Sequence, residues 1–283
     1  MNRLTDLKSI SSKLDEHNYV ADQELVTALY LCIHLNRPLL IEGPPGVGKT
    51  EVALALAEVM DTKLIRLQCY EGLDVHHAVY EWNYQRQLLS IKLQEQSNHS
   101  VAEKEKHIFS EDYLLPRPLL QAIRQTQSPV LLIDELDRSD EEFEAFLLEL
   151  LSAFQISIPE MGTIKALHKP FVILTSNRTR ELSDALKRRC LYHWIDYPDL
   201  EKEMNIVRKR LPGIEDSLLR QVVEHVQAFR ARKLSKTPGI SETIDWAEAL
   251  MALGYRHLNN EAVNHTLGTI IKSVEDQALV RTV

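Results

Sequence analysis

Short runs of apolar residues alternate with helical patterns along the first two-thirds of the chain. Five of these runs have the length and composition of buried strands, namely residues 39–41, 64–67, 130–133, 171–174 and 191–195. Apolar residues outside these runs recur at helical spacing, as in residues 22–35, which precede the first run. Strands that alternate with helices predict an α/β fold with a five-stranded parallel sheet.

The pattern changes after residue 197. Helical periods then follow one another without a strand between them, at residues 204–211, 218–229, 243–253 and 261–279. We therefore expect an α/β domain over residues 1–197 and an all-helical domain over residues 198–283.

Two segments of the α/β part depart from simple alternation. The link between the second and third strands is long, and we predict an insert over residues 74–116. Its apolar residues keep a loosely helical spacing from residue 79 to residue 93, and a polar, partly mobile stretch follows over residues 94–106. Residues 155–167 alternate apolar and polar positions around a turn, which predicts a β-hairpin. The first 20 residues are polar, and we expect a helical arm there rather than a core element.

The candidate chemistry begins directly after the first predicted strand. The motif G-x-x-x-x-G-K-[ST] occurs there as Gly43-Pro44-Pro45-Gly46-Val47-Gly48-Lys49-Thr50, and the segment after it has no helix breaker. Glycines let backbone N–H groups turn towards a phosphate, and a helix N-terminus adds partial positive charge. Lys49 suits the β- and γ-phosphate oxygens of ATP, and the Thr50 hydroxyl suits Mg²⁺. We predict that this loop, together with Glu51, binds the nucleotide.

Two carboxylates, Asp134 and Glu135, stand at the end of the third predicted strand. Ligands of parallel sheets bind at the carboxyl ends of the strands. Asp134 is suited to hold the water shell of the Mg²⁺ that Thr50 contacts, and Glu135 is suited to orient and deprotonate the attacking water. The two motifs together predict ATP hydrolysis.

The composition is that of an ordinary water-soluble globular protein. The 283 residues are 44% hydrophobic and 26% charged, and no apolar run approaches the roughly 18 residues of a membrane span, although peripheral membrane association stays open. The net charge of −8 argues against nucleic acid as the partner of the chain as a whole. Residues 1–12 lack the apolar stretch of a secretory signal, so we expect a cytoplasmic protein.

Cysteines and histidines give no sign of a disulfide framework or a further metal site. The cysteines Cys32, Cys69 and Cys190 are far apart and odd in number, which suits free thiols in a reducing compartment. The histidines, among them His77, His99 and His107, lack a metal-ligand spacing.

The order of the parts resembles that of AAA+ ATPases. Within these, the chain most resembles the MoxR-type group, in the branch named for CoxD, which is linked to the maturation of carbon monoxide dehydrogenase. The phrases that carry the resemblance are Tyr80-Glu81-Trp82-Asn83-Tyr84, Arg117-Pro118-Leu119-Leu120, Ile158-Pro159-Glu160-Met161-Gly162, Thr175-Ser176-Asn177-Arg178-Thr179-Arg180-Glu181-Leu182 and Thr237-Pro238-Gly239-Ile240-Ser241-Glu242-Thr243. The resemblance implies that the insert and the hairpin are the helix-2 insert and pre-sensor-1 hairpin, which face the pore of a ring, and that the C-terminal helices form a lid.

The resemblance also assigns roles to residues beyond the P-loop. Asn177 resembles the sensor-1 residue, an amide between the γ-phosphate and the attacking water. Arg189, with Arg188 as the second choice, resembles the cation that a neighbouring subunit adds to the phosphoryl group. Arg138 is a weaker candidate for a contact between subunits.

One feature of such lids is missing. Many AAA+ lids carry a sensor-2 arginine near the start of the helix that here begins at Ser241, and this chain has no arginine there. Arg230 and Arg232 are candidates to replace it.

The resemblance implies a homo-oligomeric ring, a hexamer, with ATP and Mg²⁺ bound between subunits. It implies that hydrolysis remodels or matures a protein client, a metalloenzyme among the candidates, together with a partner that carries a von Willebrand A domain. Met161 and Glu160 at the hairpin tip are candidates for contact with the client. Two alternatives stay open: a motor that acts on nucleic acid, and a nucleotide-gated binding scaffold with little turnover, which the missing sensor-2 arginine favours.

Overall fold

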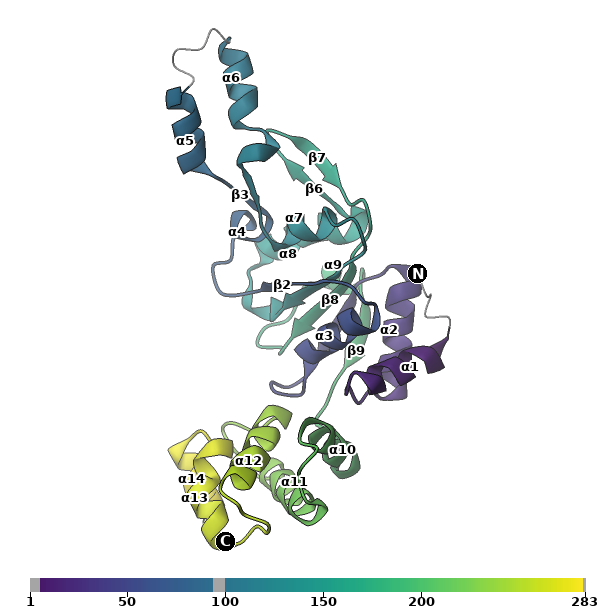
Figure 1. The fold of residues 1–283 in the computed structure, drawn as a ribbon, viewed down its shortest axis with the longest axis vertical. Helices are drawn as coiled ribbons and strands as arrows, with labels where there is room; N and C mark the ends of the chain where they lie inside the picture. The colour runs from purple at the N-terminus through teal and green to yellow at the C-terminus, as the bar shows by residue number, and fades with distance from the viewer. Residues whose placement is uncertain (1–5, 94–99, 282–283) are drawn as a thin grey trace. The chain divides into compact units, whose positions relative to one another are not determined.

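The computed structural model describes residues 6–93 and 100–281. Its internal contacts divide the chain into two compact units, each made of separate segments. Figure 1 shows the course of the chain, coloured by residue number. The first unit contains Met1–Val26, Glu42–Ala55 and Trp194–Val283, and the second contains Thr27–Ile41 and Leu56–His193. The P-loop therefore belongs to the same unit as the C-terminal helices, and a domain boundary after residue 197 stays a prediction.

A five-stranded sheet forms the base of the second unit and confirms the predicted fold class. Its strand order is β2-β5-β8-β1-β9, and β5 pairs in parallel with both β2 and β8. The strands are β1 (Leu39–Glu42), β2 (Leu64–Gln68), β5 (Val130–Asp134), β8 (Phe171–Ser176) and β9 (Leu191–Trp194). Every residue of β1, β5 and β8 is buried, as in parallel sheets that are covered on both faces.

Helices complete the core of this unit. They are α4 (Val75–Val79), α7 (Pro118–Ile123), α8 (Glu141–Ala153) and α9 (Asp184–Lys187), while α2 (Gln23–Leu35) and α3 (Lys49–Val59) extend into the first unit. Helix α7 packs on β2 and β5, and α8 buries Phe143, Leu147 and Leu150 in the same cluster. The three cysteines are free thiols, as predicted, and burial raises the pKa of each to about 12.

The insert contains an antiparallel ribbon that the apolar spacing did not predict. Strand β3 (Tyr80–Trp82) pairs with β4 (Leu114–Pro116), which follows the 3-10 turn η1 (Glu111–Tyr113). The expectation of helical structure from residue 79 to residue 93 was therefore wrong for β3, whose Tyr80 and Trp82 are buried while Glu81 points outward. Such alternation is typical of a strand, but three residues are too few to display a period.

The chain segment that connects β3 to β4 contains two helices, α5 (Tyr84–Leu93) and α6 (Val101–Ile108). These two helices pack against each other. Part of the stretch for which no regular period was found, residues 101–106, belongs to helix α6, while its partial mobility stays a prediction. The start of α6 is fixed by a capping box, because the Glu103 carboxylate accepts the Ser100 N–H (2.8 Å) and the Ser100 hydroxyl accepts the Glu103 N–H (3.3 Å). Residues 94–99, which include His99, lie outside the described residues. The predicted hairpin is confirmed by the antiparallel pairing of β6 (Gln155–Ile158) with β7 (Gly162–Lys165).

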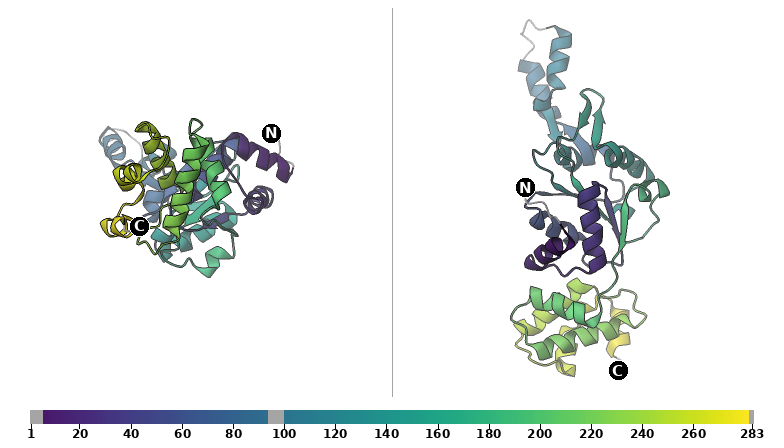
Figure 2. Two further views of the ribbon diagram at one scale, coloured as in Figure 1. Left: turned by 90° about the horizontal axis from the view of Figure 1, so that it is seen from below. Right: turned by 90° about the vertical axis from the view of Figure 1, so that its right-hand side faces the viewer.

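The first unit is helical apart from the P-loop segment. Its helices are α1 (Leu7–Glu16), α10 (Leu200–Arg210), α11 (Asp216–Arg230), α12 (Ile240–Ala252), α13 (Asn260–Ile270) and α14 (Val274–Arg281). Helices α10 to α14 form a bundle (Figure 2), as predicted. Trp246 is fully buried in it and donates to the Thr266 hydroxyl (2.7 Å). In the described ranges, no helix is both long and apolar enough to cross a membrane.

Helix α1 is a packed element and not an arm. Ile10 and Leu14 are completely buried. They lie one helical turn apart and form a narrow apolar stripe on a largely polar helix. The polar composition of the first 20 residues therefore hid the two residues that pack. Residues 1–5, with the beginning of the predicted helical arm, lie outside the described residues.

Candidate functional site

The loop between β1 and α3 depends on glycine at three positions. Gly46 and Gly48 have φ angles of +76° and +89°, a region in which a side chain is strained. A Cβ atom on Gly43 would lie only 2.0 Å from the carbonyl oxygen of Ile195. The loop thus has the tight curvature from which backbone N–H groups can surround an anion.

Lys49 lies at the start of α3 and is buried. Its ammonium group donates to the carbonyl oxygens of Gly43 (2.9 Å) and Pro44 (2.7 Å). The side chain therefore folds back along the loop, and a positive charge is held beside the segment that would receive a phosphate. Thr50 follows in the first turn of α3.

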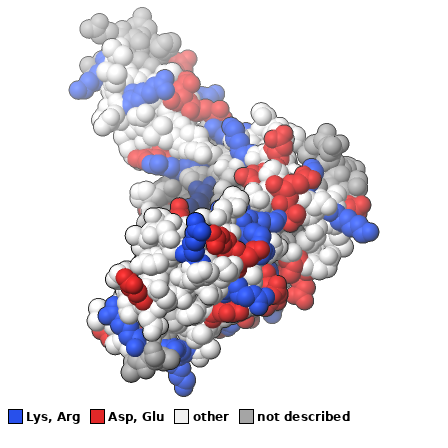
Figure 3. All heavy atoms as spheres, turned by 60° about the horizontal axis from the view of Figure 1, so that its bottom comes forward, with Lys and Arg blue, Asp and Glu red and all other residues white. Residues whose placement is uncertain are grey.

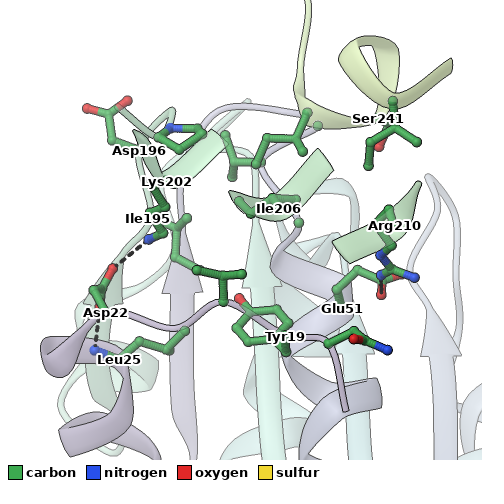
Figure 4. Close-up of a pocket in the computed structure, with 18 of the residues that line it drawn as sticks. Tyr19, Asp22, Leu25, Glu51, Ile195, Asp196, Lys202, Ile206, Arg210 and Ser241 are labelled. Carbon is green, nitrogen blue, oxygen red and sulfur yellow. Dashed lines mark hydrogen bonds and ion pairs between the residues drawn. The ribbon is translucent and has the colours of Figure 1, made fainter. Parts of the chain in front are cut away.

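A pocket of about 290 Å³ opens beside this loop, within the first unit (Figure 4). Its walls come from the turn after α1, from the loop and the start of α3, and from segments that include α10 and the start of α12. Two ion pairs link these walls, Glu51 with Arg210 and Asp22 with Lys202 (2.9 Å). Its size is near the lower end of small-molecule sites.

The pocket wall nearest to these ion pairs includes a tyrosine and apolar side chains. Burial, and then the negative charges of Asp22 and Glu51, raise the pKa of Tyr19, so its phenol stays protonated at neutral pH. Ile195, Ile206 and Ile240 also line the pocket. A flat aromatic ligand with polar edges would fit a pocket that has this lining. A phosphate group of the same ligand could then lie on the adjoining loop.

The start of α12 lies directly on the loop. The N–H of Ile240 donates to the carbonyl oxygen of Gly46 (2.8 Å). A Cβ atom on Gly239 would lie 2.7 Å from both the Cα and the carbonyl oxygen of Gly46. Glu242 completes the turn by accepting the N–H of Gly239 (2.9 Å). The C-terminal helices are therefore coupled to the loop through the backbone.

In the second unit, Asp134 ends β5 and is almost completely buried. Its carboxylate accepts hydrogen bonds from the Thr175 hydroxyl (2.5 Å) and from the guanidinium of Arg66 (2.6 Å). Glu135 follows in the left-handed conformation, with φ +53°. Its N–H donates to the same Thr175 hydroxyl (2.9 Å), and its carboxylate accepts from Arg138 (3.1 Å). Residues with an uncommon backbone conformation, such as that of Glu135, cluster at functional sites.

Asp137 ties the ends of β5 and β8 together. It accepts the N–H groups of Asn177 (3.1 Å) and Thr179 (2.9 Å) and the Thr179 hydroxyl (2.6 Å). Burial alone would raise the pKa of Asp137, but these hydrogen bonds outweigh it and the pKa is lowered. The backbone of Asn177 is therefore fixed by a side chain that is ionised at neutral pH.

Comparison with known proteins identifies the family. A model described as "ATPase family associated with various cellular activities (AAA)" matches residues 39–195, more than half of the chain. The chain belongs to the AAA family. Two uncharacterized proteins of Staphylococcus aureus, from strains bovine RF122 / ET3-1 and NCTC 8325 / PS 47, are each 28% identical to this AAA chain over 225 residues, 77% of either length.

Solved structures with the same fold include Thermotoga maritima RuvB, described as a Holliday junction branch migration motor. It has a TM-score of 0.51 at 17% identity, over 92% of the AAA chain and 72% of RuvB. A mutant of that protein gives a TM-score of 0.50 at 17% identity, over 93% and 69% of the two chains. At this identity the likeness shows the fold alone.

The two arginines after α9 in the AAA core differ in their contacts. Arg189 donates to the Ser152 hydroxyl (2.7 Å) and to the Ala185 carbonyl oxygen (2.9 Å) of its own chain. Arg188 is exposed, and its carbonyl oxygen accepts from Arg37 (3.1 Å). Its guanidinium has no polar partner among residues 6–93 and 100–281.

The two candidates for a replacement of sensor 2 are engaged elsewhere. Arg230 is buried and donates to both carboxylate oxygens of Glu203 (2.6 and 2.7 Å), and Arg232 donates to the Leu279 carbonyl oxygen (3.0 Å). Among the described residues, the arginine that lines the pocket beside the P-loop is Arg210, on α10. It was not singled out from the sequence, because it lies far from the helix start where such an arginine is expected.

We call the carboxyl ends of β5 and β8, around Asp134 and Glu135, the acidic edge of the sheet. Three further residues of this edge were not predicted from the sequence. Thr175 lies inside a phrase that was noted without a role, whereas Asp137 and Arg66 carry no motif signal. In β2 the buried Ile65 and Leu67 alternate with Arg66 and Gln68, but only the register Gln68↔Asp134 of the paired strands brings Arg66 near Asp134.

Proposed function

We propose that this AAA chain binds ATP with Mg²⁺ and hydrolyses it to ADP and phosphate. Residues 43–51 hold the nucleotide in this proposal, with the phosphates on the loop and the base in the adjoining pocket. The observation that carries the proposal is the backbone of the loop, which requires glycine at three positions and has the buried ammonium group of Lys49 folded against it.

Thr50 and Asp134 are the residues that would hold Mg²⁺. A hydroxyl and a carboxylate are oxygen ligands of the kind that Mg²⁺ prefers, and the Asp134 carboxylate is held in place by Arg66 (2.6 Å). The bound ion would neutralise charge on the phosphate oxygens. Glu135 orients the attacking water and takes its proton. The side-chain amide of Asn177 positions this water.

The reaction is completed by a cation from another copy of the chain. We assign this role to Arg188 ahead of Arg189, because the guanidinium of Arg189 is already bound within its own chain. A neighbouring arginine can act only in an assembly, so the proposal includes a homo-oligomeric ring, a hexamer. Hydrolysis in this ring remodels or matures a protein client, as in the MoxR-type group, and a von Willebrand A domain protein is the proposed partner.

The chemistry is tested by two substitutions with different expected results. Lys49→Ala removes the buried cation, and we expect it to abolish ATP binding and turnover. Glu135→Gln keeps the shape but removes the base, so ATP binding persists while turnover falls by about a hundredfold or more. Glu142→Gln, an exposed carboxylate on α8, is the matched control. Equal turnover in the parent protein, Lys49→Ala, Glu135→Gln and Glu142→Gln would refute the proposal.

A second candidate function is a motor that acts on DNA. The observation in its favour is the likeness of the fold to RuvB, a branch migration motor. Against it, acidic and basic side chains are interspersed on the face drawn in Figure 3, and the net charge is −8. Salt-dependent binding of duplex or branched DNA, together with stimulation of ATPase activity, would favour this function over a protein client.

A further inference from the structure

Three sequence phrases have no part in the ATP chemistry, and the structure brings them together in the second unit. Tyr80-Glu81-Trp82 forms β3, which pairs with β4. Strand β4 ends at Pro116, and Arg117 is the next residue. Arg117 forms an ion pair with Glu81. Glu160, from the turn of the β6–β7 hairpin, lines the same pocket as Tyr80 and Trp82. Segments that are about eighty residues apart in the sequence thus build one site.

The site, which we name the insert pocket, has a volume of about 310 Å³ and is lined by His77, Tyr80, Glu81, Trp82, Tyr84 and Glu160. Its aromatic rings are firmly placed, since Tyr80 and Trp82 meet edge to face with centroids 5.9 Å apart. Trp82 is held from a second side by Phe109, at 5.3 Å. A volume near the lower end of small-molecule sites suits a single side chain.

The charges of the insert pocket are unbalanced. Glu81 is neutralised by Arg117, and the imidazole of His77 is bound to Asp74 (3.0 Å). Glu160 has no ion-pair partner in the described part of the chain. Burial, and then the nearby charge of Glu160, raise the pKa of Tyr80, so the phenol stays neutral and the carboxylate is the charge that a ligand would meet.

One polar atom also lacks its complement. The indole N–H of Trp82 is buried and has no acceptor among the described residues. Buried donors of this kind are rare and call for an explanation. Because this nitrogen has no exposed surface, a ligand of the insert pocket meets the ring of Trp82 and not its N–H.

An exposed apolar stripe leads away from the insert pocket along α5. Tyr84, Leu88 and Ile91 follow one another at helical spacing on one face, and they are 64%, 59% and 43% exposed. Exposed contiguous apolar side chains mark interaction sites. The stripe begins at Tyr84, which itself lines the pocket, so one ligand can contact both.

We propose that the insert pocket binds a cationic side chain of an extended polypeptide, arginine in the first place, whose neighbouring apolar residues lie along the α5 stripe. A guanidinium over the faces of Tyr and Trp gains cation–π energy, and Glu160 supplies the opposite charge. A phosphate backbone would meet the same carboxylate unfavourably. The inference rests on the proposed function in that the polypeptide is a segment of the protein client.

The test uses the full chain and labelled peptides that differ at one position. The first peptide has one arginine between leucines, and its match carries citrulline, which keeps the shape but removes the charge. Fluorescence anisotropy should show about tenfold weaker binding of the citrulline peptide. In Tyr84→Ala and in Glu160→Gln this preference should fall to about threefold or less, because each removes one element that recognises the cation.

Matched substitutions outside the pocket control for general effects. Tyr70→Ala removes a tyrosine that is 46% exposed, and Glu181→Gln removes a carboxylate that is 82% exposed; both should keep the tenfold preference for arginine. Equal affinity for the two peptides, no binding of either, or displacement of the peptide by a single-stranded oligonucleotide would overturn the inference. ATPase activity is measured separately on each protein. An absence of turnover together with an intact preference for arginine would contradict the proposed function but not the inference about the insert pocket.

Discussion

The P-loop and the acidic edge of the sheet reach a defined geometry by different means. In the loop the backbone determines the shape, because Gly43, Gly46 and Gly48 allow no side chain without a clash or strain. At the edge, side chains determine the shape, since Thr175 links Asp134 to the backbone of Glu135 and Asp137 holds the backbone of Asn177. A backbone-determined site is contiguous in sequence, whereas a side-chain network draws on separate strands.

The difference explains what each region tolerates. At the three glycines of the loop an added methyl group meets either a close contact or a strained φ angle, while at the edge the identity and charge of particular groups matter. The arginines after α9 lie elsewhere, on an exposed segment beside Arg37, which lies just before β1. In the proposed function Arg188, whose guanidinium has no polar partner among the described residues, serves the site of another copy.

The largest expected effect comes from this arginine. Arg188→Ala should lower the turnover of the assembled protein by about a thousandfold while ATP affinity stays the same, because a cation supplied by a neighbour stabilises charge in the transition state. Turnover and nucleotide affinity are measured on the same preparation. Arg189→Ala should have a much smaller effect, since its guanidinium is bound to Ser152 and Ala185.

Mixed assemblies sharpen the result. Copies with Arg188→Ala and copies with Lys49→Ala are each expected to be inactive alone. When mixed, an intact loop can meet an intact arginine across a subunit boundary, and part of the activity should return. No recovery on mixing, or a larger loss with Arg189→Ala, would place the essential cation elsewhere.

The parts predictable from the sequence follow the same division. The parallel sheet, the P-loop and the hairpin were predictable because each is carried by a local pattern: short apolar runs, closely spaced glycines, and the alternation of apolar and polar residues. Arg66 and Asp137 were not, since their role depends on strand register, and a one-residue slip would point them elsewhere. The ribbon of β3 and β4 was missed because three-residue strands show no period, and the insert pocket joins residues far apart in the chain.

A smaller effect is expected where the loop meets α12. Gly239 has φ −84°, so alanine is permitted there by its own backbone, and the obstacle is the contact of 2.7 Å between the added Cβ atom and Gly46. Relieving it must displace the helix or the loop, and we expect Gly239→Ala to weaken ATP binding by about tenfold, or about 1.4 kcal/mol. Calorimetric titration with ATP measures this.

Gly268→Ala provides the control for that substitution. Gly268 lies in α13, and its added Cβ would meet no atom closer than 3.9 Å; alanine there should leave ATP affinity unchanged and favour the helix slightly. If Gly239→Ala bound ATP as tightly as Gly268→Ala, the backbone contact would not couple the C-terminal helices to the nucleotide.

The smallest effect concerns the pH dependence of the acidic edge. The pKa of Asp137 is lowered from its ordinary value of 3.8, so its hydrogen bonds stabilise the folded state fully above that value and are lost as the pH falls through the folded pKa. Asp137→Asn should therefore cost about 1 kcal/mol near neutral pH and flatten the fall of the unfolding free energy in acid. Urea unfolding from about pH 3 to pH 7 measures both, with the exposed Asp61→Asn as control. An identical acid dependence in Asp137→Asn and the parent protein would show that the edge is not held by the ionised carboxylate, and the contrast with the backbone-determined loop would fail.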